Sequence, residues 1–256
     1  MKIAIISDTH DNVYVIKKFI SSIKKQGIKD VIHAGDICAP ITLKLFKGIN
    51  LYFVLGNNDG DVIKLKEIAH DNNFHFLGRL GELIYNKNTR TLSILEQNII
   101  GQGDIKINRS KENVKKNNEK GKELNHDEHA ININDNSNNK EINGKDNSKD
   151  NNGKDAKLDT VYFAIYHGDN MAILFSLIYS GFYDYVICGH THKAEERLFR
   201  VSLKDINQES EEEKGRVRVK KVRLLNPGGF YPKQEDQDYY YIVVDVDNQK
   251  IERIKL

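Results

Sequence analysis

Cysteines and long apolar runs are scarce in this sequence, and their scarcity limits the classes of protein it can represent. Its two cysteines, Cys38 and Cys188, are too far apart for a C-x-x-C redox pair or a zinc knuckle, and they argue against a disulfide framework. No segment stays apolar for the roughly 18 residues that a membrane-spanning helix needs. No cleavage site follows the apolar start. We therefore expect a cytoplasmic protein with no membrane partner.

The sequence also lacks an excess of basic or acidic residues. The chain has 39 basic and 37 acidic residues, which leaves a formal net charge of +2. Such a balance does not indicate a field that attracts nucleic acid, and the basic residues do not cluster with aromatic ones in an RNA-binding pattern. The phosphate loop G-x-x-x-x-G-K-[ST] and the G-x-S-x-G elbow are also absent. Nucleic acid is therefore not indicated as a partner, while a homo-oligomer stays open.

Polar, low-complexity sequence interrupts the chain at residues 97–159. Asparagine and lysine are abundant there, and apolar residues occur singly without a period. Such a segment cannot bury enough apolar surface to offset the entropy of ordering it. Long flexible insertions add little to the cost of closing a loop. We therefore predict one domain spanning residues 1–256, interrupted by a long disordered insertion.

Outside this insertion, short apolar runs alternate with segments of helical periodicity. The alternation predicts an α/β fold in which parallel strands are joined by crossover helices. Two runs separated by the turn-rich residues 86–90 predict an antiparallel hairpin instead. Helices are expected at 13–25, 41–47 and 171–179, and strands at 3–6, 30–34, 50–55, 80–85, 91–95, 160–166, 183–188, 197–203, 217–225 and 239–246.

Side chains that can bind metal follow five of the expected strands. Each stands beside glycine, asparagine or threonine in a loop, which is an unusual setting for so many helix caps. Loops at the carboxyl ends of parallel strands meet at one edge of an open α/β sheet, so distant residues can share a site. The set consists of Asp8, His10, Asp36, Asn57, His167, His190 and His192.

The chemistry of this set favours transition metals. Two carboxylates, one amide and four imidazoles suit Mn, Ni, Fe, Co or Zn better than Ca or Mg, which prefer all-oxygen shells. Seven ligands exceed one tetrahedral site, and they suffice for two ions about 3.5–4 Å apart if one carboxylate bridges them. Such a pair supplies a hydroxide at neutral pH and clamps the oxygens of a displacement at phosphorus.

The ordered motifs D-x-H, G-D, G-N-x-D, H-G and G-H-x-H resemble those of the calcineurin-like metallophosphoesterases. With the later Asn226-Pro-Gly-Gly229, the sequence is similar to their small bacterial and archaeal phosphodiesterase subgroup. The resemblance implies a four-layer α/β/β/α sandwich of two mixed β-sheets flanked by helices, and two divalent ions, Mn or Ni foremost. It also implies that Asp8, His10 and His192 bind one ion, that Asn57, His167 and His190 bind the other, that Asp36 bridges both, and that Asp36, His190 and Asn57 are catalytic.

One departure from the family pattern affects the expected substrate. Asn58 stands where many members have a histidine that protonates the leaving group, and an amide cannot act as a general acid. The resemblance therefore favours a metal-dependent phosphodiesterase, a hydrolase acting on a small phosphodiester, and Asp59 is expected to orient the loop. Candidates for hydrogen bonds to the substrate phosphate are Asn12, Asn58 and Thr191.

Two other functions stay open. A retromer subunit is similar in its motifs yet serves mainly as an assembly surface, so a catalytically weak protein-binding scaffold is one alternative. The complete set of expected ligands favours catalysis over this role. The other alternative is a phosphomonoesterase or a nuclease. Asn58 weighs against the former, and the lack of an obvious basic groove weighs against the latter.

Overall fold

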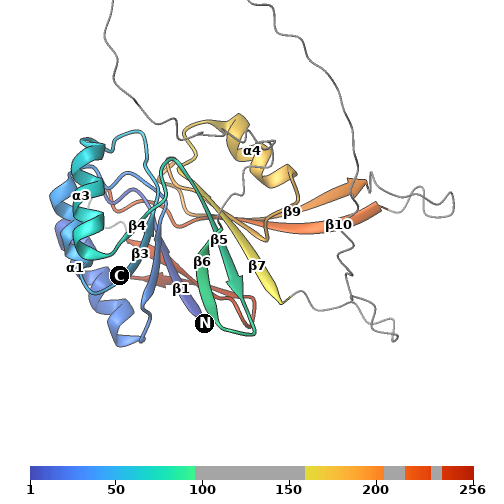
Figure 1. The fold of residues 1–256 in the computed structure, drawn as a ribbon, viewed down its shortest axis with the longest axis horizontal. Helices are drawn as coiled ribbons and strands as arrows, with labels where there is room; N and C mark the ends of the chain where they lie inside the picture. Colours follow the sequence, from blue (N-terminus) through green and yellow to red (C-terminus); the bar gives the residue numbers. More distant parts are fainter. Residues whose placement is uncertain (96–158, 205–216, 232–237) are drawn as a thin grey trace, which may run out of the picture. The chain divides into compact units, whose positions relative to one another are not determined.

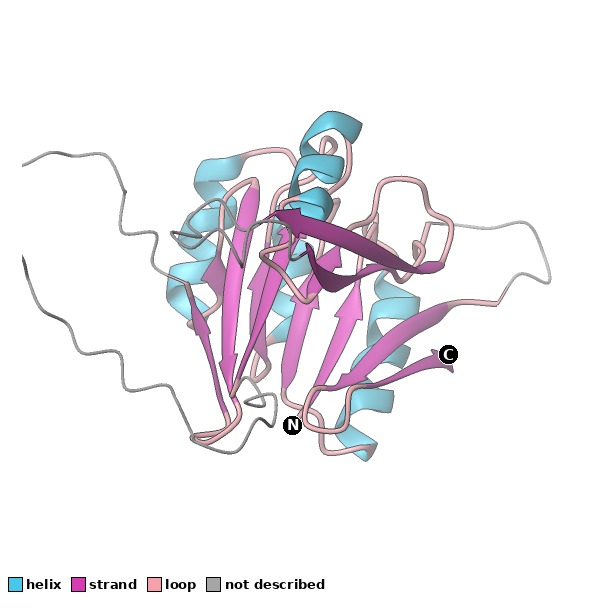
Figure 2. Ribbon diagram, turned by 90° about the vertical axis from the view of Figure 1, so that its right-hand side faces the viewer, coloured by secondary structure: helices cyan, strands magenta, loops and turns pink. Residues whose placement is uncertain are grey.

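Two β-sheets face each other, and helices cover their outer faces (Figure 1, Figure 2). The structure is a computed structural model, and it describes residues 1–95, 159–204, 217–231 and 238–256. Nearly all of the predicted insertion at 97–159 therefore lies outside the described residues. No helix within the described residues is both long and apolar enough to span a membrane.

The first sheet has the strand order β12-β11-β1-β2-β3-β4. β1, β2 and β3 are parallel neighbours, as the alternation of strands and helices predicts. The short β4 and the antiparallel edge strand β12 were not expected, and the strand predicted at 239–246 is therefore not the last one. The bounds are β1 Lys2–Ile6, β2 Asp30–His33, β3 Asn50–Phe53, β4 His75–Phe76, β11 Tyr240–Asp245 and β12 Lys250–Lys255.

The second sheet has the order β6-β5-β7-β8-β10-β9. β7, β8 and β10 are parallel neighbours, and β5 and β6 form the predicted antiparallel hairpin. β6 and β7 lie on either side of β5, so the segment between them does not close a hairpin. The bounds are β5 Leu80–Asn86, β6 Thr91–Ile94, β7 Thr160–Tyr166, β8 Tyr185–Ile187, β9 Glu195–Lys204 and β10 Val217–Asn226.

Four α-helices and one 3-10 turn are present in the described residues. α1 (Val13–Lys25) and α4 (Met171–Tyr179) have the predicted bounds, whereas the helix expected at 41–47 is α2 (Pro40–Leu43) followed by the 3-10 turn η1 (Lys44–Phe46). α3 (Val62–Asn72) was not predicted. Its signals were present, because Asp61 accepts a hydrogen bond from the Lys64 amide and apolar residues follow at helical spacing.

Successive side chains of a strand point to opposite faces of its sheet, and this alternation gives the structure its layers. In β1, Ile3 and Ile5 belong to the core between the sheets, while Ala4 and Ile6 pack into a second core beneath α1, α2 and α3. A third core lies between α4 and the outer face of the second sheet. Figure 1 shows α1 and α3 on one flank and α4 on the other. The predicted four-layer α/β/β/α arrangement is therefore confirmed.

Candidate metal centre

The parallel strands of both sheets end at the same edge of the sandwich, and the loops that follow them meet there. Ser7, just after β1, forms a parallel bridge with Gly229, which follows β10 of the other sheet. His167, which follows β7 of the second sheet, also contacts the first sheet. Its Nδ1 lies 2.8 Å from the carbonyl oxygen of Ala34, which follows β2. These links bring the seven predicted ligands into one region.

Two buried carboxylates lie at the centre of this region. The Asp8 carboxylate accepts hydrogen bonds from the Ser7 hydroxyl at 2.5 Å and from the His190 amide at 3.0 Å. Burial raises the pKa of Asp8, although the hydrogen bond from Ser7 and the nearby histidines act in the opposite direction. Positive charge close to Asp8 would therefore favour its ionised form.

Asp36 is held as an anion by its partners. The backbone amide and the side-chain amide of Asn58 each donate to its carboxylate at 2.8 Å. Burial alone would raise the pKa of Asp36, but hydrogen bonds from His167 and Asn58 outweigh it, and the pKa lies below its usual range. Asp36 is thus a fixed negative charge in the middle of the site.

Four of the predicted ligands form one compact group. One ligand atom from each lies within 4.8 Å of the others. The Nε2 atoms of His10 and His192 are 3.2 Å apart, and the latter is 3.3 Å from Asp8 Oδ1. Asp36 Oδ2 lies 3.5 Å from His10 Nε2. The group consists of Asp8, His10, Asp36 and His192.

The remaining three predicted ligands form a second group, which also approaches Asp36. Asn57 Oδ1 lies 3.0 Å from His167 Nε2 and 2.9 Å from His190 Nδ1. His167 Nε2 is also 3.4 Å from Asp36 Oδ2 and 3.9 Å from Asp8 Oδ1. Asp36 Oδ2 therefore lies within 3.5 Å of an imidazole nitrogen from each group, as a bridging carboxylate requires.

The hydrogen-bonding partners of His167 indicate that its Nε2 binds a cation, either a proton or a metal ion. Because its Nδ1 donates to the Ala34 carbonyl, the neutral ring has a lone pair on Nε2, and this lone pair faces the oxygens of Asp36 and Asn57. Acceptors that face acceptors repel one another unless a proton or a metal ion lies between them. Burial opposes the charged ring, but the hydrogen bonds to Asp36 and Ala34 and the charge of Asp8 outweigh it and raise the pKa of His167.

The donor set fits divalent metal ions. Nitrogen and oxygen ligands are mixed and a carboxylate lies between the groups, which suits borderline transition metals better than Ca²⁺ or Mg²⁺. The second nitrogen of His167 is fixed by a backbone carbonyl, as is usual for metal-binding histidines. The structure therefore fits divalent metal binding, without selecting one metal.

The backbone around the site is strained and tightly packed. Five of the seven predicted ligands have positive φ, including Asp8 at 50°, Asp36 at 60° and His190 at 67°. At Gly189, a Cβ would lie 1.8 Å from Ser7 Oγ, and at Gly56 it would lie 2.1 Å from Asp36 Oδ1. Any side chain at these two positions would displace the carboxylates.

Asp59 holds the loop that carries Asp36. Its two oxygens accept backbone N–H bonds of 2.7–2.9 Å from Asp36, Ile37, Cys38 and Gly56. The expectation that Asp59 orients this loop agrees with these contacts. With both oxygens occupied by backbone donors, the carboxylate has a positioning role.

The three residues predicted to bind the substrate phosphate all contact their own chain. Asn12 accepts from the Val15 amide and donates to the Phe230 carbonyl at 2.7 Å. The Asn58 side chain donates to Asp36, and the Thr191 hydroxyl accepts from Asn226. Asn58 and Thr191 are exposed. Contact of these three residues with substrate stays a prediction.

The two cysteines differ in their surroundings. Cys188 is buried in the core beneath α4. Cys38 is half-buried, and its Sγ lies 3.3 Å from His10 Nδ1, on the ring edge that faces away from the ligand group. Burial and the carboxylates of Asp36 and Asp11 raise the pKa of Cys38 to about 12, so it remains a neutral thiol beside His10.

Sequence reasoning missed one aromatic residue at the site. Tyr231 has its ring centroid 5.2 Å from that of His10 and 5.4 Å from that of His192. It follows the Asn226–Gly229 segment, which is the one signal that places it near the site. No spacing rule indicates that its ring contacts two predicted ligands.

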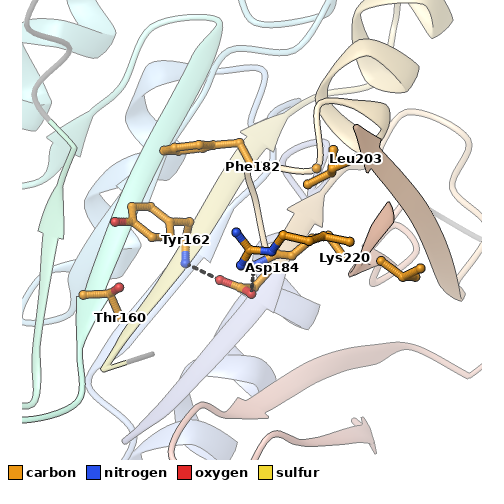
Figure 3. Close-up of a pocket in the computed structure, with 9 residues that line it drawn as sticks. Thr160, Tyr162, Phe182, Asp184, Leu203 and Lys220 are labelled. Carbon is orange, nitrogen blue, oxygen red and sulfur yellow. Dashed lines mark hydrogen bonds and ion pairs between the residues drawn. The ribbon is translucent and has the colours of Figure 1, made fainter. Parts of the chain in front are cut away.

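The cavity in Figure 3 lies away from these residues. It has a volume of about 270 Å³ and is lined at its floor by Asp184, which pairs with Lys220 and accepts from the Tyr162 amide. Thr160 and Tyr162 stand at the start of β7, whereas His167 follows its end. The cavity is therefore at the opposite ends of the strands from the candidate metal centre.

The fold and the ligand set define a class of protein. The family model of the calcineurin-like phosphoesterase superfamily domain matches residues 1–249, so the chain belongs to this family. A phosphodiesterase of Methanocaldococcus jannaschii is 29% identical over 201 residues, which cover 78% of this chain and 76% of that protein.

A solved structure of another protein shares the fold. The structure of an archaeal phosphodiesterase has a TM-score of 0.54 and 23% identity, and the match covers all of both chains. Vps29 of Entamoeba histolytica has a TM-score of 0.42 and 13% identity over all of this chain and 99% of that one. The latter likeness is too weak to decide function.

Proposed function

We propose that the protein is a metal-dependent phosphodiesterase that hydrolyses a small phosphodiester. The observation that carries this proposal is the position of Asp36, a buried carboxylate between two groups of imidazole and oxygen ligands. Membership of the phosphoesterase family and the phosphodiesterase relative in M. jannaschii support it. Mn²⁺ and Ni²⁺ are the foremost candidates for the two ions.

The two groups divide the ligands. Asp8, His10 and His192 would hold one ion, Asn57, His167 and His190 would hold the other, and Asp36 would contribute to both. When bound, such a pair supplies a hydroxide nucleophile and neutralises charge that develops on the phosphoryl oxygens.

The protein keeps these ligands in fixed orientations. The Ala34 carbonyl fixes the tautomer of His167, and Asn58 fixes the Asp36 carboxylate. Asp8 is oriented by Ser7 and by the His190 amide, which also links the two sheets. Preorganisation of this kind lowers the cost of assembling the charged site during the reaction.

The position of Asn58 favours diesters as substrates. Its side-chain amide is hydrogen-bonded to Asp36 and has no acidic proton to give to a leaving group. A leaving alkoxide must therefore depart without a proton from this residue, which disfavours phosphomonoesters with poor leaving groups.

Hydrolysis of bis(4-nitrophenyl) phosphate tests the proposal. We expect turnover with added Mn²⁺ or Ni²⁺, loss of turnover with a chelator, and recovery when metal is restored. The Asp36→Ala variant should be inactive. The matched control is Asp30→Ala, because Asp30 lies at the opposite end of the same strand and bonds only Asn50 among the described residues. Equal activity of Asp36→Ala and wild type would refute the proposal, and a wild type without metal or turnover would favour a scaffold.

A further inference from the structure

Tyr231 is presented to the site by an anchored turn. The Phe230 amide donates to the Asp8 carbonyl, and the Phe230 carbonyl accepts from Asn12. The Phe230 ring is fully buried against Phe19. The backbone that leads to Tyr231 is therefore fixed on both sides, next to a predicted ligand.

The Tyr231 ring is half covered by ligands and half exposed. It meets His10 edge-on at an interplanar angle of 83° and His192 at 38°, yet 51% of the residue is exposed. Its hydroxyl makes no hydrogen bond within the described part of the chain. An aromatic ring is thus held against two predicted ligands, and its other side is exposed with respect to the described residues.

The start of α1 is tied to the same turn by the Asn12 bond to Phe230, and the first two residues of this helix, Val13 and Tyr14, are exposed. An exposed aromatic ring that contacts predicted metal ligands suits a ligand that combines an anionic group with a flat apolar one.

We infer that Tyr231 contacts the substrate and selects phosphodiesters in which one ester group carries a flat aromatic ring. The inference rests on the phosphodiesterase function proposed above. The ring stacks on the aromatic ester group while the phosphate lies at the metal ligands. Stacking on tyrosine tolerates different ring types, so aryl esters and nucleoside esters are both accommodated.

Binding of two phosphinates tests this inference without turnover. Methyl(phenyl)phosphinate and dimethylphosphinate each carry one negative charge and two substituents on phosphorus, as a phosphodiester does. They differ in the ring, and their P–C bonds are not hydrolysed as esters. Calorimetric titration into Mn²⁺-loaded protein should show that wild type binds methyl(phenyl)phosphinate about five- to tenfold more tightly. Tyr231→Leu should lose this preference while its affinity for dimethylphosphinate is unchanged, and Tyr231→Phe should keep the preference.

A matched control separates this effect from the loss of a surface tyrosine. Tyr179 is 57% exposed on α4 and contacts only Phe175 and Phe199 among the rings of the described residues. Tyr179→Leu should keep the wild-type preference. Circular dichroism and thermal unfolding of each variant check that it folds.

The outcomes distinguish the two proposals. If dimethylphosphinate binds but Tyr231→Leu retains the preference, or wild type has none, the inference about Tyr231 is overturned and the phosphodiesterase proposal stands. If metal-loaded wild type binds neither phosphinate, the proposed phosphodiester site itself is refuted, and the role of Tyr231 with it.

Discussion

The two sheets contribute different halves of the candidate metal centre. The first sheet provides both carboxylates, and at most 1% of either Asp8 or Asp36 is exposed. The second sheet provides three imidazoles: His167 is fully buried, whereas His190 is exposed and the side chain of His192 is 35% exposed. The negative charge of the site therefore lies on the first sheet, while the loop after β8, together with the exposed Asn57 of the first sheet, forms an open wall of the site.

The largest loss of activity is expected from a change at Asp36, which the first sheet contributes to the site. Asp36→Asn removes the negative charge that lies between both ligand groups while keeping the side-chain size. We expect activity to fall by about a thousandfold or more, since metal ions contribute several kcal/mol to catalysis. Metal content, measured by elemental analysis, should fall in parallel, whereas Asp30→Asn should retain both metal and activity.

A smaller effect is expected on the open wall. His190→Ala removes one exposed imidazole, and water can take its place at the ion. We expect activity to fall by about a hundredfold, or about 2.7 kcal/mol of barrier, with most of the metal retained. The comparison between the sheets breaks down if His190→Ala loses as much metal and activity as Asp36→Asn.

A change at Asp59, which positions the Asp36 loop, is expected to lower metal affinity and activity by less than the two changes above. Asp59→Asn keeps one carbonyl oxygen but turns an amide group toward two backbone N–H donors of the Asp36 loop. Loss of supporting contacts of this kind costs about 10- to 100-fold in metal affinity or activity. Metal titration should show weaker binding, and urea unfolding of the metal-free protein should show a loss of about 1–3 kcal/mol. An unchanged metal affinity would show that the loop does not need Asp59.

Two buried histidines, one in each sheet, have pKa values that shift in opposite directions. His33 in the first sheet accepts a hydrogen bond from the Gly35 amide at Nδ1, so its Nε2 donates to Thr9. Burial lowers the pKa of His33 to about 3. His167 in the second sheet faces carboxylates instead, and its pKa is raised. Burial alone therefore does not set the sign of the shift.

The pKa of His33 predicts acid sensitivity. The unfolded chain binds a proton near pH 6.5 and the folded chain only near pH 3, so stability is full above pH 6.5 and falls as the pH drops toward 3. The slope due to His33 should be about 1.4 kcal/mol per pH unit. Denaturant unfolding of metal-free protein should show a shallower pH dependence for His33→Gln, and an unchanged one for the exposed His70→Gln. Parallel curves for His33→Gln and wild type would contradict the prediction.

The sequence allowed the candidate ligands to be grouped, because strand ends are local features and parallel strands end together. It did not show that two sheets pair, and only the family resemblance supplied the second one. β4 has two residues, and the edge strand β12 has apolar residues only at Ile251 and Ile254, three positions apart, so neither has the alternating apolar pattern of a strand. The contact of Tyr231 with His10 and His192 depends on the turn after β10, whose geometry no local pattern specifies.

The smallest expected effect concerns the predicted insertion. It connects β6 to β7, and β7 begins at the strand end opposite to His167. From the register of both strands on β5, Leu95 and Asp159 lie about 20 Å apart, a span that eight extended residues can cover.

Replacing residues 97–157 by an eight-residue Gly/Ser linker should therefore leave the fold and the chelator-sensitive activity intact. Each halving of a loop's length lowers its closure cost by about 0.6 kcal/mol, so the free energy of unfolding should be unchanged or rise by up to about 2 kcal/mol. Thermal unfolding and hydrolysis of bis(4-nitrophenyl) phosphate check both expectations. A folded but inactive deletion variant would mean that the second sheet's share of the site extends into this segment, and the division of roles between the sheets would then need revision.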